Sequence, residues 1–505
     1  MSEELGVSRR GVLQGAGWML ATAALPAGAT GAAGLAAAGT AADTAGATIG
    51  PRGISPAMAQ LSAYMREAPA RALPGEVLEK ARRHILDTLA AMVSGSQLKP
   101  GQFAIGFARQ QSTDKGATVA ASNVVCDPVN AALANAMLAH SDETDDSHAP
   151  SQSHPGCAIV PAALAAAEHF GASGTQMLRA IVLGYDVGTR VTMTVGHGGF
   201  QTANQLSTHA VAGCFGAAAA AACMAGFDQQ QMRWVLDYAS QQASGYKIWQ
   251  RDTQHIEKAF VFAAMPARSG LSAMLLVKAG ATGVDDVFSG ADNFLSVYGD
   301  HSDPATLVEK LGERYEVTRT NIKKWSVGSP IQAPLDAIEN LRKRHPFTAA
   351  QVQEVVVRVA PSEGALVNNR EMPDICLQYM LAVMLLDGTA SFRAAHDQVR
   401  MQDLAVQRER AKVKLLLDVE LEKLLPARVA IVEVTLTSGA TLSERVEAVR
   451  GTEENPMTHA EVLAKCQELI APVLGDAQCA RLIDTVLTLE RVDDVRKLRP
   501  LLQHS

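Results

Sequence analysis

The sequence predicts a mainly helical protein, with an all-helical large domain joined to a smaller α+β domain. Apolar residues recur at helical spacing from about residue 57 to residue 312. The pattern then changes, because 352–359 is a β-branched run and two further strand-like runs flank Ser438-Gly439, as in a hairpin. With 505 residues, of which 48% are hydrophobic, the chain is long enough for more than one domain.

The first fifty residues are organised like an export signal. Ser8-Arg9-Arg10 opens a twin-arginine motif, a mildly apolar run follows from Gly11 to about Ala38, and Ala27-Gly28-Ala29 offers a cleavage site. A membrane anchor is the alternative, but the run is rich in Ala and Gly and poor in Leu, Ile and Phe. We therefore predict an export signal and linker at residues 1–50 and a periplasmic protein, with the cleavage point left open.

Three regions are expected after this signal: a helical domain at 54–312, an α+β lid domain at 313–457, and C-terminal helices at 458–500 that pack back on the helical domain. In the first region, apolar spacing and turn residues predict helices at 75–94, 131–139, 161–169, 173–191, 213–225, 229–243 and 265–280. The later regions are expected to hold strands at 315–321, 352–359, 428–437 and 440–446, and helices at 331–344, 375–386, 405–416, 458–474 and 477–489.

Composition excludes several classes of partner. The net charge is -7 and there is no basic tract, so nucleic acid is not an expected partner. No segment after the signal is expected to span a membrane. The seven cysteines have no CxxC spacing and are odd in number, which predicts buried free thiols rather than a zinc site or a disulfide framework.

The densest group of proton-carrying side chains lies between His140 and His154. Three histidines and four acidic residues fall in this stretch, between two alanine-rich helical segments. No HExxH pair or calcium-loop spacing is present, so no metal is expected. Single acids such as Asp145 and Asp146 could instead cap a helix or bind loop amides. The remaining interpretation is general acid–base catalysis by a subset of these residues.

Four residues outside this stretch are further candidates, each with a simpler alternative. His209 precedes an alanine-rich helix, where a histidine can be a packing residue. Lys258 could lay its stem along apolar surface or bind a substrate carboxylate. Lys323 and Arg370 could be solvated surface residues or could also hold carboxylates.

Several segments together resemble the MmgE/PrpD family, which includes 2-methylcitrate dehydratase, cis-aconitate decarboxylase and iminodisuccinate epimerase. The matching stretches are His84-Ile-Leu-Asp87-Thr88, the loop 140–156, Gly184-Tyr185-Asp186, Gly213-Cys-Phe-Gly216, Gln242-Ala-Ser-Gly245 and Glu454-Asn-Pro-Met-Thr458. The resemblance runs from about Leu86 to Leu489. It implies a helical domain with an α+β lid, a homodimer, and a site at the domain boundary that needs no organic cofactor.

The resemblance also assigns roles to residues. The residues that it implies as catalytic are Asp146, Ser147, His154 and His209, and those that it implies as substrate-binding are Lys258 and Lys323. Arg370, Glu143 and His148 are further substrate-binding candidates. Many members have Asp-Phe-Asp-Asp where this chain has Glu143-Thr144-Asp145-Asp146, so the choice between the two aspartates stays open. Decarboxylase-like members have a histidine a few residues after the lid lysine, and this chain has none there, which weighs against decarboxylation.

The function expected from these observations is that of a hydro-lyase acting on a hydroxylated di- or tricarboxylate. A base would remove a proton next to a carboxylate and an acid would protonate the departing hydroxyl. An epimerase for a similar acid is the second choice, and a decarboxylase the third. A periplasmic binding protein for polycarboxylates is the non-enzymatic alternative, which the long helical first half disfavours because such proteins have two α/β lobes. The expected partner is a small anionic polycarboxylate whose identity the sequence does not reveal.

Overall fold

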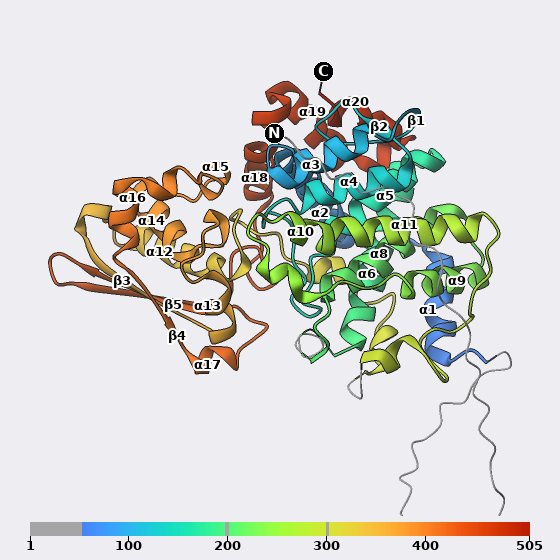
Figure 1. The fold of residues 1–505 in the computed structure, drawn as a ribbon, viewed down its shortest axis with the longest axis horizontal. Coiled ribbons are helices and arrows are strands. Elements are labelled where there is room, and N and C mark those ends of the chain that lie inside the picture. The colour runs from blue at the N-terminus through green and yellow to red at the C-terminus, as the bar shows by residue number, and fades with distance from the viewer. Residues whose placement is uncertain (1–52, 197–200, 202, 299–301, 505) are drawn as a thin grey trace, which may run out of the picture. The chain divides into compact units, whose positions relative to one another are not determined.

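The computed structural model describes residues 53–196, 201, 203–298 and 302–504 (Figure 1). The predicted export signal at 1–50 lies outside the described residues. The described chain is mainly helical with small sheets, which confirms the expected fold class in outline. Its buried apolar residues form two principal cores, one in the helical part and one around a four-stranded sheet.

The first core is built mainly from helices in the first half of the described chain. These helices are α1 Pro56–Glu67, α2 Gly75–Gly95, α3 Lys99–Arg109, α4 Pro128–Ala139, α5 Gly156–Phe170, α6 Gly174–Thr194, α8 Thr208–Ala225, α9 Gln229–Ser240, α10 Ile256–Ala259 and α11 Met265–Lys278, with a π-helical turn η3 at Phe260–Ala264. Single 3-10 turns lie at η1 Ala68–Ala70, η2 Lys247–Arg251, η4 Phe294–Tyr298, η5 Pro304–Leu307 and η6 Glu316–Arg319.

Local side-chain chemistry sets several of these boundaries. Ser173 and Gln176 form a reciprocal capping box at the start of α6, as the sequence predicted for Ser173. Asp127 accepts hydrogen bonds from the backbone amides of Val129 and Asn130 and so begins α4. Helix α5 ends at Gly171, whose left-handed backbone (φ 65°) suits glycine.

Helices α6 and α8 pack closely because small residues line their contact. A β-carbon added at Gly188 on α6 would lie 2.1 Å from the carbonyl oxygen of Ala212 on α8. One added at Gly216 on α8 would lie 2.6 Å from the Cδ1 atom of Ile159. This close approach brings the N-terminal end of α8, with its histidine, against the loop that precedes α5.

Gly188→Ala is therefore expected to lower the free energy of unfolding by about 1–3 kcal/mol, because an extra methyl group cannot fit without separating the two helices. Gly106→Ala is the matched control. It lies within α3 with no atom within 4 Å of the added β-carbon, and should be neutral or stabilising by up to about 1 kcal/mol. Urea unfolding of both variants checks the difference, and equal stabilities would contradict it.

Two helical segments of this core are long and apolar, contrary to the expectation that no segment after the signal could span a membrane. Helix α8 and the continuous run Ile256–Lys278 are long and apolar enough to cross a membrane by length and composition, so the expectation of no such segment was wrong. Among the described residues, 89% of α8 is buried in the protein, and so is 67% of the apolar 18-residue stretch within Ile256–Lys278. Helices that are apolar on all sides are typical of the core of a large protein.

The first half was expected to be all-helical, and this was wrong. Strand β1 Ser112–Thr118 pairs with β2 Val125–Cys126. Strand β1 is polar and mostly exposed, so it lacks the apolar alternation that marks a strand in sequence. The first core also includes residues near the C-terminus, from α18 His459–Leu474, α19 Asp476–Leu487 and α20 Arg499–Leu502. All seven cysteines are buried and free, as predicted.

The second core surrounds a sheet with the strand order β4-β3-β5-β6. Its strands are β3 Val352–Val359, β4 Val413–Leu417, β5 Ala430–Leu436 and β6 Thr441–Val446, and its helices are α12 Ser329–Arg344, α13 Pro361–Val367, α14 Leu377–Asp387, α15 Phe392–Ala395, α16 Leu404–Arg410 and α17 Val419–Glu422. Strand β3 runs parallel to β4 and antiparallel to β5. Helices α12 and α14 cover one face of the sheet (Figure 1). The predicted hairpin is confirmed as β5 and β6.

Two predicted elements were wrong, and both errors have a tertiary cause. The expected strand at 315–321 is the 3-10 turn η6, held because the backbone amide of Glu316 donates to the carboxylate of Asp186 and its side chain pairs with Arg190. The expected helix at 405–416 ends at Arg410, and its last residues form strand β4 beside β3. Pairing with a distant strand outweighed the local helical pattern.

Candidate active site

The loop between α4 and α5 runs through the protein interior. The side chains of His140, Asp145 and Asp146 are fully buried, and His154 is 8% exposed. Buried polar groups need partners, and the two ends of the loop supply some of them. The amide of His140 donates to the carbonyl of Ala136, closing α4, and the amide at the start of α5 donates to Asp146.

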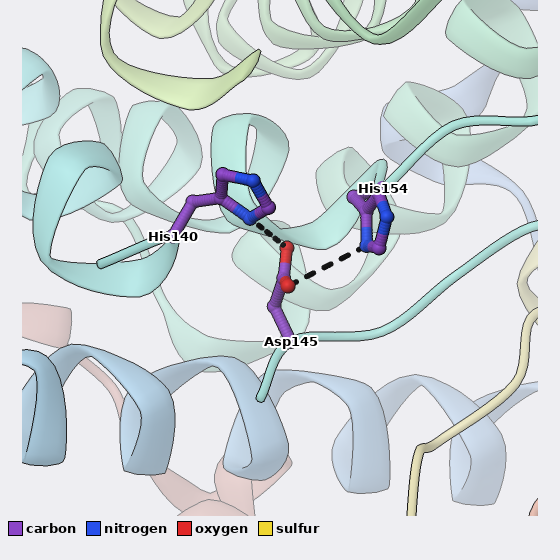
Figure 2. A group of neighbouring side chains, drawn as sticks. All are labelled: His140, Asp145 and His154. Atoms are coloured by element: carbon purple, nitrogen blue, oxygen red, sulfur yellow. Dashed lines mark hydrogen bonds and ion pairs between the residues drawn. The ribbon is translucent and has the colours of Figure 1, made fainter. Parts of the chain in front are cut away.

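Asp145 lies between two imidazoles (Figure 2). Its carboxylate is 3.0 Å from Nδ1 of His140 and 3.4 Å from Nδ1 of His154, and Nζ of Lys323 lies 3.7 Å away. Burial by itself would raise the pKa of Asp145, but its contacts with the imidazoles of His140 and His154 and with the ammonium of Lys323 hold it well below its usual value. The carboxylate is therefore ionised at neutral pH.

The same three residues have ligand atoms within 4.8 Å of one another, close enough to hold a metal ion. The His140 ring nitrogen is already within hydrogen-bonding distance of the carboxylate, and the ammonium of Lys323 supplies positive charge beside it. A divalent cation would have to displace this hydrogen bond and approach the ammonium. The arrangement favours a hydrogen-bonded acid–base group.

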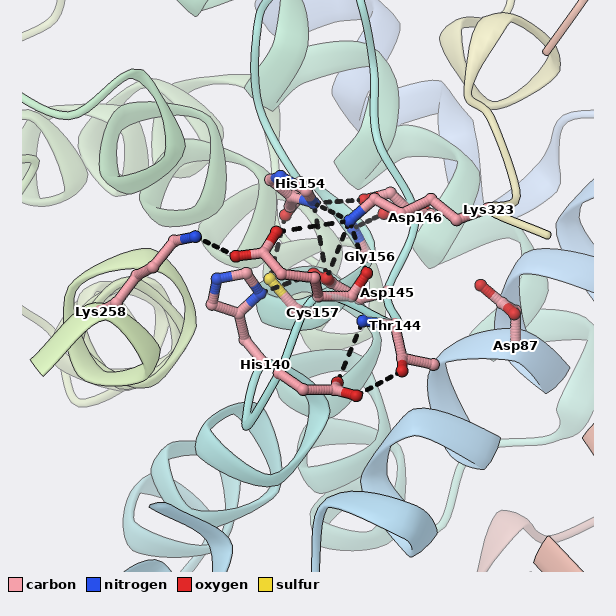
Figure 3. A network of polar contacts seen from close by, with 12 residues as sticks. Asp87, His140, Thr144, Asp145, Asp146, His154, Gly156, Cys157, Lys258 and Lys323 are labelled. Atoms are coloured by element: carbon pink, nitrogen blue, oxygen red, sulfur yellow. Dashed lines mark hydrogen bonds and ion pairs between the residues drawn. The ribbon is translucent and has the colours of Figure 1, made fainter. Parts of the chain in front are cut away.

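Lys258 and Lys323, from distant parts of the chain (Figure 3), meet at Glu143. Lys258, on α10, donates to Oε1 of Glu143. Lys323 donates to the backbone carbonyl of Glu143 at 2.8 Å and lies 3.8 Å from Oε2. Although burial alone would raise the pKa of Glu143, the charges of Lys258 and Lys323 hold it well below its usual value. The two predicted substrate-binding lysines therefore lie at one point.

Backbone pairing and helix geometry place these lysines. The amides of Ser147 and Asn321 exchange hydrogen bonds of 3.0 and 2.8 Å, which fixes the segment carrying Lys323 against the loop. Lys258 is followed by the π-helical turn that contains Phe262. The Phe262 ring stacks on the ring of His209 on α8, with the two ring centres 3.7 Å apart. Such turns are frequently found at functional sites.

The histidines of this group have environments suited to neutral imidazole. Burial, followed by the charge of Lys323, lowers the pKa of His154, and burial with neighbouring His154 lowers that of His209. The two rings stack at 4.9 Å. Nδ1 of His154 lies 2.6 Å from the backbone carbonyl of Asp146, so this nitrogen carries the proton and donates. The other ring nitrogen, Nε2, is then free to accept a proton.

Asp146 has a different role from Asp145. Its carboxylate accepts hydrogen bonds from Nδ1 of His84 at 3.0 Å, the hydroxyl of Tyr185 at 2.5 Å and the amide of Gly156 at 3.0 Å. These bonds engage both oxygens. Asp146 therefore holds the loop and orients His154, whereas Asp145 faces the cationic group.

His255 is a member of the group that sequence reasoning missed. It is buried, its backbone is left-handed (φ 61°), and neither ring nitrogen has a hydrogen-bond partner among the described residues. Its Nδ1 lies 4.0 Å from Glu143, and its ring centre 5.2 Å from that of His140. Burial and the charge of Lys258 lower its pKa well below the usual value. Its only sequence signal is its place three residues before Lys258.

Three predicted site residues lie outside the cluster, which consists of His140, Glu143, Asp145, His154, His209, His255, Lys258 and Lys323. Ser147 contributes only the backbone pairing described above. His148 hydrogen-bonds to Ser151 at 2.8 Å and to Glu316 at 3.2 Å, away from the lysines. Arg370 lines a small hollow of about 240 Å³ that also includes Thr253.

A larger, open hollow of about 610 Å³ lies beside α10 and is lined by residues that include Met137, Arg251 and Thr253. Its lining and that of the smaller hollow share Thr253, so Arg251 and Arg370 place cations at neighbouring openings. Neither lining, within the described residues, includes Lys258, Lys323 or the histidines. The side chains of Lys258 and His154 remain 17% and 10% exposed, so the cluster is largely but not fully buried.

A second buried group lies beside the first. Nε2 of His396 is 3.1 Å from the carboxylate of Asp142, and the Asp374 carboxyl is close enough for the charges of Asp142 and Glu143 to affect it. Burial, partly offset by His396, raises the pKa of Asp374 from its usual 3.8 to about 7. The native protein therefore keeps this proton over a pH range in which the unfolded chain has lost it.

This difference predicts that stability falls as the pH rises from about 4 to about 7, because the native state binds more protons than the unfolded state there. Asp374→Asn removes the contribution. The variant should therefore gain stability relative to the wild type, on the order of 1–3 kcal/mol, between about pH 5 and about pH 8. Urea unfolding at the two pH values measures the change, and a constant difference between variant and wild type would contradict it.

The similarity of this chain to known proteins covers most of its length. Residues 59–307 match the MmgE/PrpD N-terminal domain, and residues 325–491 match the MmgE/PrpD C-terminal domain. The chain is similar to cis-aconitate decarboxylase of Aspergillus terreus, with 25% identity over 463 residues that cover 85% of this chain and 92% of that protein. It is also similar to the cis-aconitate decarboxylase-like protein oryM of Aspergillus oryzae (24% identity; 88% and 96% covered) and to human cis-aconitate decarboxylase (26% identity; 85% and 91% covered).

Proposed function

Because the chain belongs to the MmgE/PrpD family, whose relatives named above are lyases, we propose that it is a hydro-lyase acting on a hydroxylated di- or tricarboxylate. The observation that carries the proposal is the orientation of His154. Its Nδ1 donates to the carbonyl of Asp146, which leaves Nε2 as a free base in a buried group with two lysines.

The proposed reaction uses side chains of this chain for each proton transfer. Lys258 and Lys323 bind a substrate carboxylate and stabilise the negative charge that develops on it when the neighbouring carbon loses a proton. His154 removes that proton, and the electron pair left on carbon forms a double bond as the hydroxyl departs. The hydroxyl leaves as water with the proton that His154 has taken from carbon, and His209, stacked beside His154, is placed to relay that proton.

Decarboxylation is the second candidate, and the names of the relatives favour it, because the proteins reported above are cis-aconitate decarboxylases or a decarboxylase-like protein. The missing histidine after Lys323 weighed against it in sequence. The structure weakens that objection, because His140 and His255 lie beside Glu143 and Lys258 and offer imidazoles from other segments.

One assay separates the reactions. The purified protein is incubated with hydroxylated and with unsaturated di- and tricarboxylates in heavy water while ultraviolet absorbance and released CO2 are followed. A rise in absorbance without CO2 supports dehydration, and CO2 release from an unsaturated acid supports decarboxylation. Exchange of a carbon-bound proton without either signal supports an epimerase, and binding without any change overturns a lyase function.

We further propose a periplasmic homodimer in which the 313–457 region acts as a lid over the site. Cell fractionation of the full chain and of an Arg9→Lys, Arg10→Lys variant tests the location, because a twin-arginine signal requires the arginine pair. Light scattering of the purified protein tests the dimer.

A further inference from the structure

Glu143 occupies the place where a substrate carboxylate would be expected. Its side chain is buried, one carboxylate oxygen accepts from Lys258, and the other lies 3.8 Å from Nζ of Lys323. The two lysines assigned to substrate binding in the proposed function therefore already face a carboxylate of the chain itself. A substrate carboxylate can bind them only by sharing or displacing this contact.

The two lysines and the two carboxylates that they face balance in charge without a substrate. Lys258 and Lys323 supply two positive charges, and Glu143 and Asp145, whose pKa values are held low, supply two negative ones. The histidines with lowered pKa values, His154, His209 and His255, are neutral at neutral pH.

The groups packed around the cluster add little to this balance. Asp374 retains its proton up to about neutral pH, and His396 pairs with Asp142. Lys465, on α18, pairs with Asp87 at 2.6 Å. Each carboxylate that a substrate brings into the interior therefore adds a charge with no unpaired cation to meet it, which is costly in a buried site.

Two further cations lie at the openings. Arg251 and Arg370 line the two neighbouring hollows that share Thr253. A substrate with one carboxylate at the lysines and a second at these arginines satisfies both positions. A third carboxylate would have to lie where Glu143 already lies.

We propose that Glu143 determines specificity by taking the position of a third substrate carboxylate, so that the site selects hydroxylated dicarboxylates over tricarboxylates. This inference rests on the proposed function and narrows its substrate class. It makes Glu143 the residue that sets how many negative charges the site accepts.

The test compares two acids that differ in one group. Citramalate carries a methyl group where citrate carries a carboxymethyl group, so their kcat/KM ratio reports the effect of one extra carboxylate. The wild type should prefer citramalate, and Glu143→Gln, which removes one negative charge, should shift the ratio towards citrate by at least about tenfold. An unchanged ratio, or an equal loss with both acids, overturns the inference.

Glu143→Asp is the matched control, because it keeps the charge and shortens the side chain by one methylene. It should keep the wild-type ratio within about threefold even where its overall rate falls. If it instead behaves like Glu143→Gln, the contact with Lys258 rather than the charge sets the preference, and the inference fails.

A measurement on the wild type alone tests the inference even if the variants fail to fold. Succinate and propane-1,2,3-tricarboxylate, which carry no hydroxyl to lose, are compared as ligands by calorimetry. Tighter binding of succinate is expected, and equal or tighter binding of the tricarboxylate overturns the inference. If the wild type neither converts the hydroxy acids nor binds either ligand, the proposed function itself fails.

Discussion

Replacing His154 with alanine is expected to lower kcat by about 10²–10⁴-fold, because the variant loses the base that the structure positions most firmly. The imidazole donates through Nδ1 to the carbonyl of Asp146 at 2.6 Å, and it lies 3.4 Å from Asp145. Steady-state kinetics on any acid found active in the screen measures the loss.

The pH dependence of the wild-type rate is a second test of His154 as the base. Burial and the charge of Lys323 lower the pKa of His154 below its usual 6.5, so the base stays deprotonated, and the wild-type rate should hold, at pH values below that figure. His169→Ala is the control, because this histidine is exposed on α5 outside the cluster. A His154→Ala enzyme with wild-type melting temperature and full turnover would exclude His154 as the base.

Replacing Lys323 with methionine is expected to lower the free energy of unfolding by about 3–5 kcal/mol at neutral pH, because it leaves buried carboxylates without their cation. Lys323 is 4% exposed and lies within 4 Å of Glu143 and Asp145. Urea unfolding at about pH 7 measures the loss.

Lys324→Met is the matched control for this substitution. Lys324 is the next residue in the chain and makes an ion pair of 2.6 Å with Glu339, whose side chain is 23% exposed. A partly solvated pair of this kind contributes about 0–1 kcal/mol. Similar losses in the two variants would show that the buried carboxylates near Lys323 do not depend on it.

The elements that sequence reasoning placed well are those with short-range causes. The capping box at Ser173 involves residues three apart, and the hairpin of β5 and β6 follows from Ser438-Gly439 and the β-branched runs beside it. The expected strand at 315–321 failed because Asp186, 130 residues away from Glu316, holds that segment in a turn. Strand β4 was missed because its partner β3 lies more than fifty residues earlier in the chain.

The candidate site divides in the same way. The loop 140–154, the family, and the candidates His154, His209, Lys258 and Lys323 could all be proposed from residue types, motifs and resemblance. The sequence could not separate Asp145 from Asp146, because adjacent residues in a loop have no periodicity to orient them. It also gave no reason to select His255, whose importance comes from its burial beside Glu143.

By itself, then, the chain's order of residues determined its helical character, its smaller α+β part and its membership of the MmgE/PrpD family, because periodicity, caps and motifs act over a few residues. Only the tertiary structure decided that Lys258 and Lys323, 115 and 180 residues from Glu143, meet at that carboxylate. The reason is physical: a buried charge is stable only where packing of distant helices brings its partner within a few ångströms, and no local pattern records that distance.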